Sequence, residues 1–87
     1  MKRIYKYTIN MQTGSCEIPG DSKILMVENQ HGKPCIWVET DTAHRGGRIK
    51  VMMVGTGDFV PRRSEHIGSV MLHDGEYVFH VYRLVEN

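Results

Sequence analysis

Glycine-based turn signals recur along this chain at short intervals and leave no stretch long enough for an extended helix. The segments between them are rich in Val, Ile, Tyr and Thr, and none carries an apolar stripe with helical spacing. The sequence therefore predicts an all-β fold, a small antiparallel sandwich or a partly open barrel of about six to seven strands. The turn signals are Thr13-Gly14, Gly20-Asp21, His31-Gly32, Gly46-Gly47, Gly55-Thr56-Gly57 and Asp74-Gly75.

The expected strands span residues 3–10, 15–18, 23–30, 35–41, 48–55, 66–72 and 76–84. With 87 residues and no sign of a second core, the chain is expected to form one domain over residues 1–87. A core this small gains stability from burial against a second copy, so a homo-oligomer is expected.

The first of two hairpins turns at Asp74-Gly75, because both residues tolerate the positive φ that a two-residue turn requires. Counting outward assigns one face to the core and marks Gly68 as a bend or a close approach. The core face holds the pairs Leu72–Tyr77, Val70–Phe79 and Gly68–Val81, and the opposite face holds Met71–Val78, Ser69–His80 and Ile67–Tyr82.

The second hairpin turns at His31-Gly32, with the pairs Asn29–Pro34, Val27–Ile36 and Leu25–Val38 on its core face. Pro34 lacks an amide hydrogen, so it is expected at a sheet edge or outside the ladder. The opposite face carries Met26, Glu28, Cys35, Trp37 and Glu39. Trp37 and Glu39 are therefore candidates for a protein-interaction surface.

Charge gives this chain little overall attraction to a partner. Eleven Lys and Arg oppose ten Asp and Glu, for a formal net charge of +1. Neither a nucleic acid polymer nor a membrane is expected as a partner. The basic amino terminus has no apolar segment behind it, so a cytoplasmic location is expected. Cys16 and Cys35 are expected to be reduced, structural thiols, unless their strands are neighbours and form a disulfide.

Histidines raise the question of metal or acid–base chemistry. His66 and His73 stand at opposite ends of one expected strand, and the hairpin register places His80 on the other face from His66. Since no two of them are expected to converge, no metal site and no cofactor are predicted. The serines lack a GxSxG elbow and the cysteines lack a neighbouring histidine, so the sequence predicts a binding protein and no enzyme.

Two glycine-bearing loops with four arginines form the best candidate ligand site. Arginine forks and accessible backbone amides suit a phosphate or carboxylate, and the alternative is a solvated hairpin loop and a bulge. The loops flank one strand, which separates them by more than about 20 Å at roughly 3.4 Å per residue. One shared anion site would then lie between two copies of the chain. Its residues are Arg45, Gly46, Gly47 and Arg48 in one loop and Gly55, Thr56, Gly57, Arg62, Arg63 and His66 in the other.

Several motifs resemble a family of small uncharacterised β-rich proteins of bacteria and their phages. They are residues 23–38, Gly55-Thr56-Gly57, His66-Ile67-Gly68 and 78–81. The resemblance implies a compact β domain encoded on mobile elements, without known catalytic residues. Arg62-Arg63 departs from it, because a more acidic loop is expected there.

Small phage proteins without enzymatic motifs are often inhibitors of host defence, an analogy at the level of gene class. The first function hypothesis is a counter-defence protein that sequesters an anionic, nucleotide-like signal through the arginine loops. The alternative is a protein–protein inhibitor or structural module that binds, for example, a host defence protein through the Trp37 face. An enzyme acting on a phosphorylated small molecule is the minor alternative.

Overall fold

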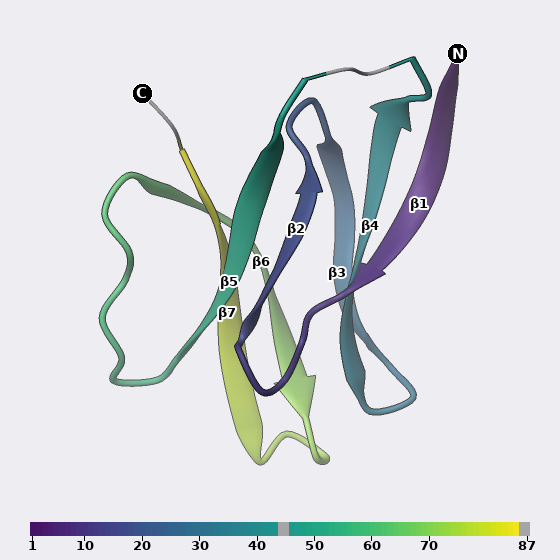
Figure 1. Ribbon diagram of the computed structural model, residues 1–87. Coiled ribbons are helices and arrows are strands. Elements are labelled where there is room, and N and C mark those ends of the chain that lie inside the picture. The colour runs from purple at the N-terminus through teal and green to yellow at the C-terminus, as the bar shows by residue number, and fades with distance from the viewer. Residues whose placement is uncertain (44–45, 86–87) are drawn as a thin grey trace.

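The computed structural model describes residues 1–43 and 46–85, and within these ranges the chain forms seven strands and two antiparallel sheets. A three-stranded sheet has the order β1-β4-β3, and a four-stranded sheet has the order β2-β5-β7-β6 (Figure 1). This confirms the all-β sandwich, which does not close into a barrel. The strands are β1 Lys2–Thr8, β2 Ser15–Pro19, β3 Lys23–Gln30, β4 Lys33–Asp41, β5 Arg48–Gly55, β6 Ser64–Leu72 and β7 Tyr77–Leu84.

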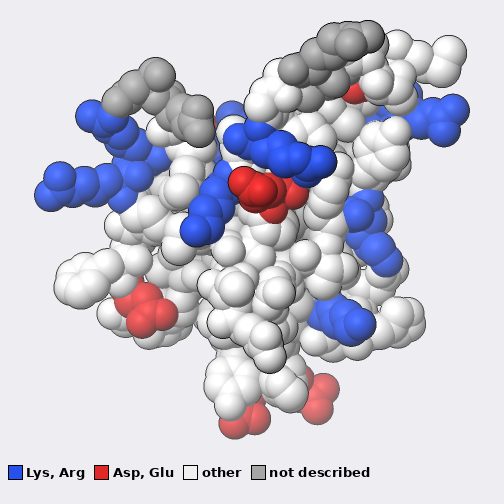
Figure 2. All heavy atoms as spheres, viewed as in Figure 1, with Lys and Arg blue, Asp and Glu red and all other residues white. Residues whose placement is uncertain are grey.

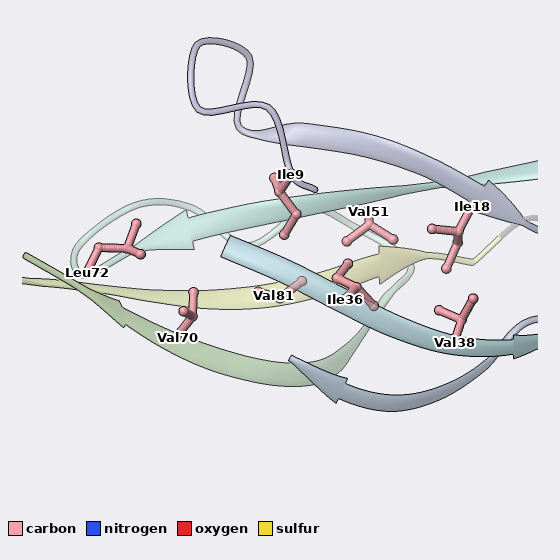
Figure 3. Packing of buried hydrophobic residues seen from close by; sticks show 8 residues of the cluster. All are labelled: Ile9, Ile18, Ile36, Val38, Val51, Val70, Leu72 and Val81. Carbon is pink, nitrogen blue, oxygen red and sulfur yellow. The ribbon is translucent and has the colours of Figure 1, made fainter. Parts of the chain in front are cut away.

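The core lies between the two sheets and is entirely aliphatic at its centre (Figure 3). The sheets pack more closely at β3 and β6 than at β1 and β2. The sandwich is therefore more open along the β1 and β2 side, where the candidate site lies. The fully packed residues are Ile9, Ile18, Ile36, Val38, Val51, Val70, Leu72 and Val81.

The hairpin at Asp74-Gly75 is confirmed, with φ of 54° and 86° at its two central residues. The expected register holds from Leu72 back to Gly68 and then shifts, because a β-bulge lies between His66 and Gly68. His66, and not Ile67, therefore pairs with Tyr82. This one-residue shift corrects the expected facing of every side chain before the bulge.

The hairpin at His31-Gly32 is also confirmed, with φ of 53° and 84°. Val27 pairs with Ile36 as expected, but a bulge between Ile24 and Met26 places Ile24 opposite Val38. Leu25 is consequently 42% exposed, and its assignment to the core was wrong.

Four of the other expected core residues are confirmed as buried: Val70, Leu72, Ile36 and Val38. Val27 and Phe79 are only partly buried and pack against the core cluster. Tyr77 is 49% exposed, so its assignment to the core was wrong. Tyr77 is the first residue of β7, directly after the turn.

Pro34 lies in the central strand β4, so the expectation of an edge position was wrong. Its carbonyl accepts a hydrogen bond from the Ile9 amide at 2.9 Å. The reciprocal bond cannot form because proline has no N–H, and the regular part of β1 ends one residue earlier, at Thr8.

Cys16 of β2 and Cys35 of β4 are free thiols in different sheets. Burial, and then the charge of Glu17, raise the pKa of Cys16 to about 11. No helix in the described part of the chain is long and apolar enough to cross a membrane.

Candidate functional site

A cleft of about 230 Å³ lies at the upper end of the sandwich, where β1 and β5 begin (Figure 1). Tyr5 and Tyr7 of β1 form its aromatic wall. Gly46, Gly47 and Arg48 form a second wall, so the first predicted arginine loop lines this cleft as far as the structure describes it. Arg45, the remaining residue of that loop, lies outside the described residues.

The polar floor of the cleft is the end of β4, which also anchors the start of β1. Thr40, Asp41 and Thr42 line this part. The Met1 carbonyl accepts hydrogen bonds from the Thr42 amide at 2.8 Å and from Thr42 Oγ1 at 3.0 Å. The Asp41 carboxylate lies 3.4 Å from the amino-terminal nitrogen. These contacts hold the strand that presents the two tyrosines.

The Asp41 carboxylate is stabilised in its charged form. A hydrogen bond from the Ala43 amide, and then the amino-terminal charge, hold the pKa of Asp41 below its ordinary value of 3.8. That hydrogen bond, from the Ala43 amide to Asp41 Oδ1, is 2.8 Å long. Asp41 is therefore an organising group of the β4 end and is engaged before any ligand arrives.

Arg48 supplies the positive charge of the cleft. It is exposed and makes no ion pair with any residue that the structure describes. The adjacent backbone is fixed by a 2.9 Å hydrogen bond from the Gly20 amide to the Gly47 carbonyl. A guanidinium stays charged at every physiological pH and offers parallel donors to an oxyanion. The cleft thus combines phenol rings with a cation that has no ion-pair partner among the described residues, while the Asp41 carboxylate that also lines it is engaged by the amino terminus and the Ala43 amide.

Arg62 and Arg63 lie at the same end of the sandwich as Arg48, which corrects the predicted separation. Residues 56–63 run back along the four-stranded sheet, as the green segment of Figure 1 shows. The Arg63 carbonyl accepts the Val85 amide at 2.6 Å. The β5–β7 ladder reaches Val51 opposite Arg83, and Ile49 and Val85 line one small cavity beyond it. If the same spacing continues, the Ile49 and Arg63 backbones are two strand spacings apart, about 10 Å.

Charge is unevenly distributed over the molecule as a result. Figure 2 shows most Lys and Arg over the upper part of the visible face, with an acidic group among them and further Lys or Arg on the lower right, and only Asp and Glu at the lower tip. That tip is the turn between β6 and β7, which contains Asp74 and Glu76. A chain with net charge +1 therefore still presents a basic end.

Gly55, Thr56 and Gly57 do not join this site. Gly55 and Thr56, with Glu76 and Tyr77, line a separate cavity of about 260 Å³ toward the other end of β5, and Gly57 follows them in the chain. The Gly55 amide donates to Asp58 Oδ2 at 3.2 Å. Two carboxylates in this region disfavour an anion, so the structure divides the predicted site into two parts.

His66 also does not line the cleft and lies on the outer face of β6. The prediction that no two histidines converge was wrong. His66 Nε2 lies 3.1 Å from Ser69 Oγ, and His80 Nδ1 lies 2.7 Å from the same oxygen. The bulge before Gly68 is the cause, because it turns His66 to the face of His80. Among the described residues, no group of three or more His, Cys, Asp or Glu could hold a metal ion.

Trp37 and Glu39 lie on the outer face of the three-stranded sheet. Trp37 stands between Lys6 of β1 and Met26 of β3, and Glu39 Oε2 lies 3.6 Å from the ammonium nitrogen of Lys2. Met26 is 44% exposed. This face is therefore half-apolar, with charged groups around the tryptophan.

Sequence reasoning missed Tyr5 and Tyr7. The signal was present, because alternate residues of a strand share a face and these two are aromatic. Their proximity to Arg48 depends on how the two sheets pack, which a single sequence does not reveal.

Comparison with known proteins gives one match. The family model described as "Domain of unknown function (DUF7352)" matches residues 1–87. No curated protein and no solved structure matches the chain.

Proposed function

We infer the function from the site alone, because the chain belongs to the DUF7352 family, whose description assigns no activity. We propose that the protein is a non-catalytic binding protein that holds a small, nucleotide-like anion in the upper cleft. The observation that carries this proposal is the placement of Tyr5 and Tyr7 in one cavity with Arg48, which forms no ion pair within residues 1–43 and 46–85.

The phosphate and the base of a nucleotide each have a counterpart in the cleft. Arg48 suits a phosphate, because its planar fork makes charge-assisted hydrogen bonds to two oxygens. A tyrosine ring offers a stacking surface for a base, and such contacts tolerate different bases. The volume of about 230 Å³ is small for an entire nucleotide, so part of the ligand would extend into solvent.

The arginines outside the cleft support the proposal through their position. Arg62 and Arg63 belong to the same basic end and would attract an anion at low ionic strength. Because one chain brings Arg48 and Arg63 to the same end, the argument for an anion site between two copies no longer holds. A homo-oligomer is then proposed only on the ground of the small core.

The biological role that we propose is sequestration of a signalling nucleotide as a counter to host defence, in the cytoplasm of a bacterial host. It is supported by the resemblance to small phage proteins and by the absence of a catalytic motif in the sequence. Binding without turnover is sufficient for this role.

Calorimetric titration with a panel of linear and cyclic nucleotides tests the proposal. We expect binding by the wild-type protein and weakening by about tenfold or more in Arg48→Gln, since a charge-assisted contact contributes about 1.5–3 kcal/mol. Tyr5→Ala should weaken binding as well. Lys33→Gln, a matched loss of charge at the β3–β4 turn, should leave it unchanged. No binding across the panel, or equal weakening by Lys33→Gln, contradicts the proposal.

A second candidate function is docking on a protein through the outer face around Trp37. It is favoured by Ile4, which is 62% exposed in β1, and by the exposure of Met26 on the same face. Native mass spectrometry of protein purified from its host cells separates the two candidates. A retained small anion supports the cleft, whereas a retained protein that is lost in Ile4→Lys supports the face.

A further inference from the structure

His66, Ser69 and His80 form a side-chain cluster on the outer face of β6 and β7, away from the cleft. Both histidines direct a ring nitrogen at one oxygen, Ser69 Oγ, from 3.1 Å and 2.7 Å. Their ring centroids lie 5.9 Å apart. All three residues are exposed, so the cluster is open to an ion from solvent.

The backbone fixes this arrangement. In the register of β6 and β7, His66 is opposite Tyr82 and Ser69 is opposite His80. The intervening bulge turns His66 to this face, and bulges commonly redirect a side chain in this way at functional sites. The Tyr82 ring packs edge-on against His66 at 5.3 Å and supports its orientation. The two imidazoles are thus held close by adjacent strands at little cost in conformational entropy.

The side chains next to His66 and His80 on β5 carry no charge, so the two imidazoles are the principal candidates for metal ligands. At the facing positions of β5, Val54 pairs with His80 and Met52 pairs with Tyr82, so no lysine or arginine stands beside the pair there. Imidazole nitrogens are preferred ligands for zinc, copper and nickel ions. Two imidazoles on one tetrahedral metal have ring centroids about 5.3 Å apart at typical metal–nitrogen distances. The observed 5.9 Å is close to this value, and small side-chain rotations would close the difference.

We propose that His66 Nε2 and His80 Nδ1 bind one divalent first-row transition-metal ion between β6 and β7. The ion lies between the two ring nitrogens, the Ser69 hydroxyl rotates away to make room for it, and water completes its coordination. Because only two protein ligands hold it, the site is labile and keeps positions open to solvent. The ion cross-links two strands of the folded chain, so binding stabilises the folded state.

Titration of the metal-free protein with CuCl₂, ZnCl₂ and MgCl₂, above neutral pH, tests this site by calorimetry and by the melting temperature. We expect copper to bind more tightly than zinc, as divalent ions generally rank on nitrogen ligands. Magnesium should neither bind nor raise the melting temperature, because it requires oxygen ligands. His66→Ala and His80→Ala should each weaken copper binding by about tenfold or more.

Three variants serve as controls. His73→Ala removes an imidazole at the turn of the same hairpin and should leave copper affinity unchanged, as should His31→Ala in the other hairpin. Ser69→Ala should retain binding, since the hydroxyl is not a principal ligand. If His66→Ala does not fold, His66→Asn replaces it.

The proposal is overturned if copper fails to bind the wild-type protein. It is also overturned if affinity survives in both His66→Ala and His80→Ala, or falls equally in His73→Ala. The proposed metal site is separate from the cleft. The Arg48→Gln variant should therefore bind copper as the wild type does.

Discussion

Gly68 of β6 lies directly against Val27 of β3, where the two sheets approach each other. A Cβ at position 68 would stand 2.7 Å from Val27 Cγ2 and 2.8 Å from its Cβ. Only glycine fits under the valine side chain at this spacing. The same strand carries the bulge before Gly68, so close sheet packing and the redirection of His66 occur together.

The first prediction is that Gly68→Ala destabilises the fold by about 1–3 kcal/mol through overpacking. Chemical denaturation measures the loss. Gly47→Ala is the control, since nothing lies within 4 Å of its added methyl group. Combining Gly68→Ala with Val27→Ala should recover part of the lost stability. A fully stable Gly68→Ala would contradict the observed approach of the sheets.

The second prediction distinguishes the core face from the surface. Ile36→Ala should cost about 2–5 kcal/mol, because Ile36 is fully buried at the centre of the cluster. Leu25→Ala should change stability much less, because the bulge exposes this side chain. Urea unfolding of both variants gives the comparison. Equal losses would show that Leu25 is packed after all.

Sequence patterns predicted the parts of the fold that depend on local rules. Both hairpin turns follow from residues that tolerate positive φ, and the pairing nearest each turn follows by counting. The two bulges, at Leu25 and Ile67, were not predictable, because counting outward from a turn assumes an unbroken register. One inserted residue was enough to expose Leu25 and to bring His66 beside His80.

In the candidate site, too, some features could be predicted from residue type and others could not. Gly46, Gly47 and Arg48 were recognised from residue type, and the structure puts them in a cavity. The return path of residues 56–63 was not predictable, since loops have no fixed direction in sequence. For this reason the distance between the two arginine loops was overestimated, and Tyr5 and Tyr7 were overlooked.

The third prediction concerns the turn between β6 and β7. Gly75 has a φ of 86°, a region that β-branched residues resist. Gly75→Val should therefore cost about 1–3 kcal/mol in unfolding free energy. Asp74→Asn should be nearly neutral, because asparagine tolerates positive φ. An unchanged melting temperature in Gly75→Val would argue against this turn.

The fourth prediction follows from Cys16. Its pKa is raised from 9.0 to about 11, so the folded state binds the thiol proton more tightly than the unfolded state. The resulting stability is fully present below pH 9.0 and is lost as pH rises toward 11. Cys16→Ala removes this contribution, so its unfolding free energy should fall less over that interval than that of the wild type. If the unfolding free energy of Cys16→Ala falls as much as that of the wild type over this pH interval, the raised pKa of Cys16 is not the cause of the loss.

The central claim is that the upper cleft binds a nucleotide-like anion. Two-dimensional NMR during titration with the tightest nucleotide of the panel tests it most directly. We expect the amide signals of Tyr5, Tyr7, Gly47 and Arg48 to shift together and saturably, while the Trp37 indole signal stays in place. Shifts confined to Trp37, Met26 and Ile4, or no saturable shift at all, would contradict the assignment of the cleft as the binding site.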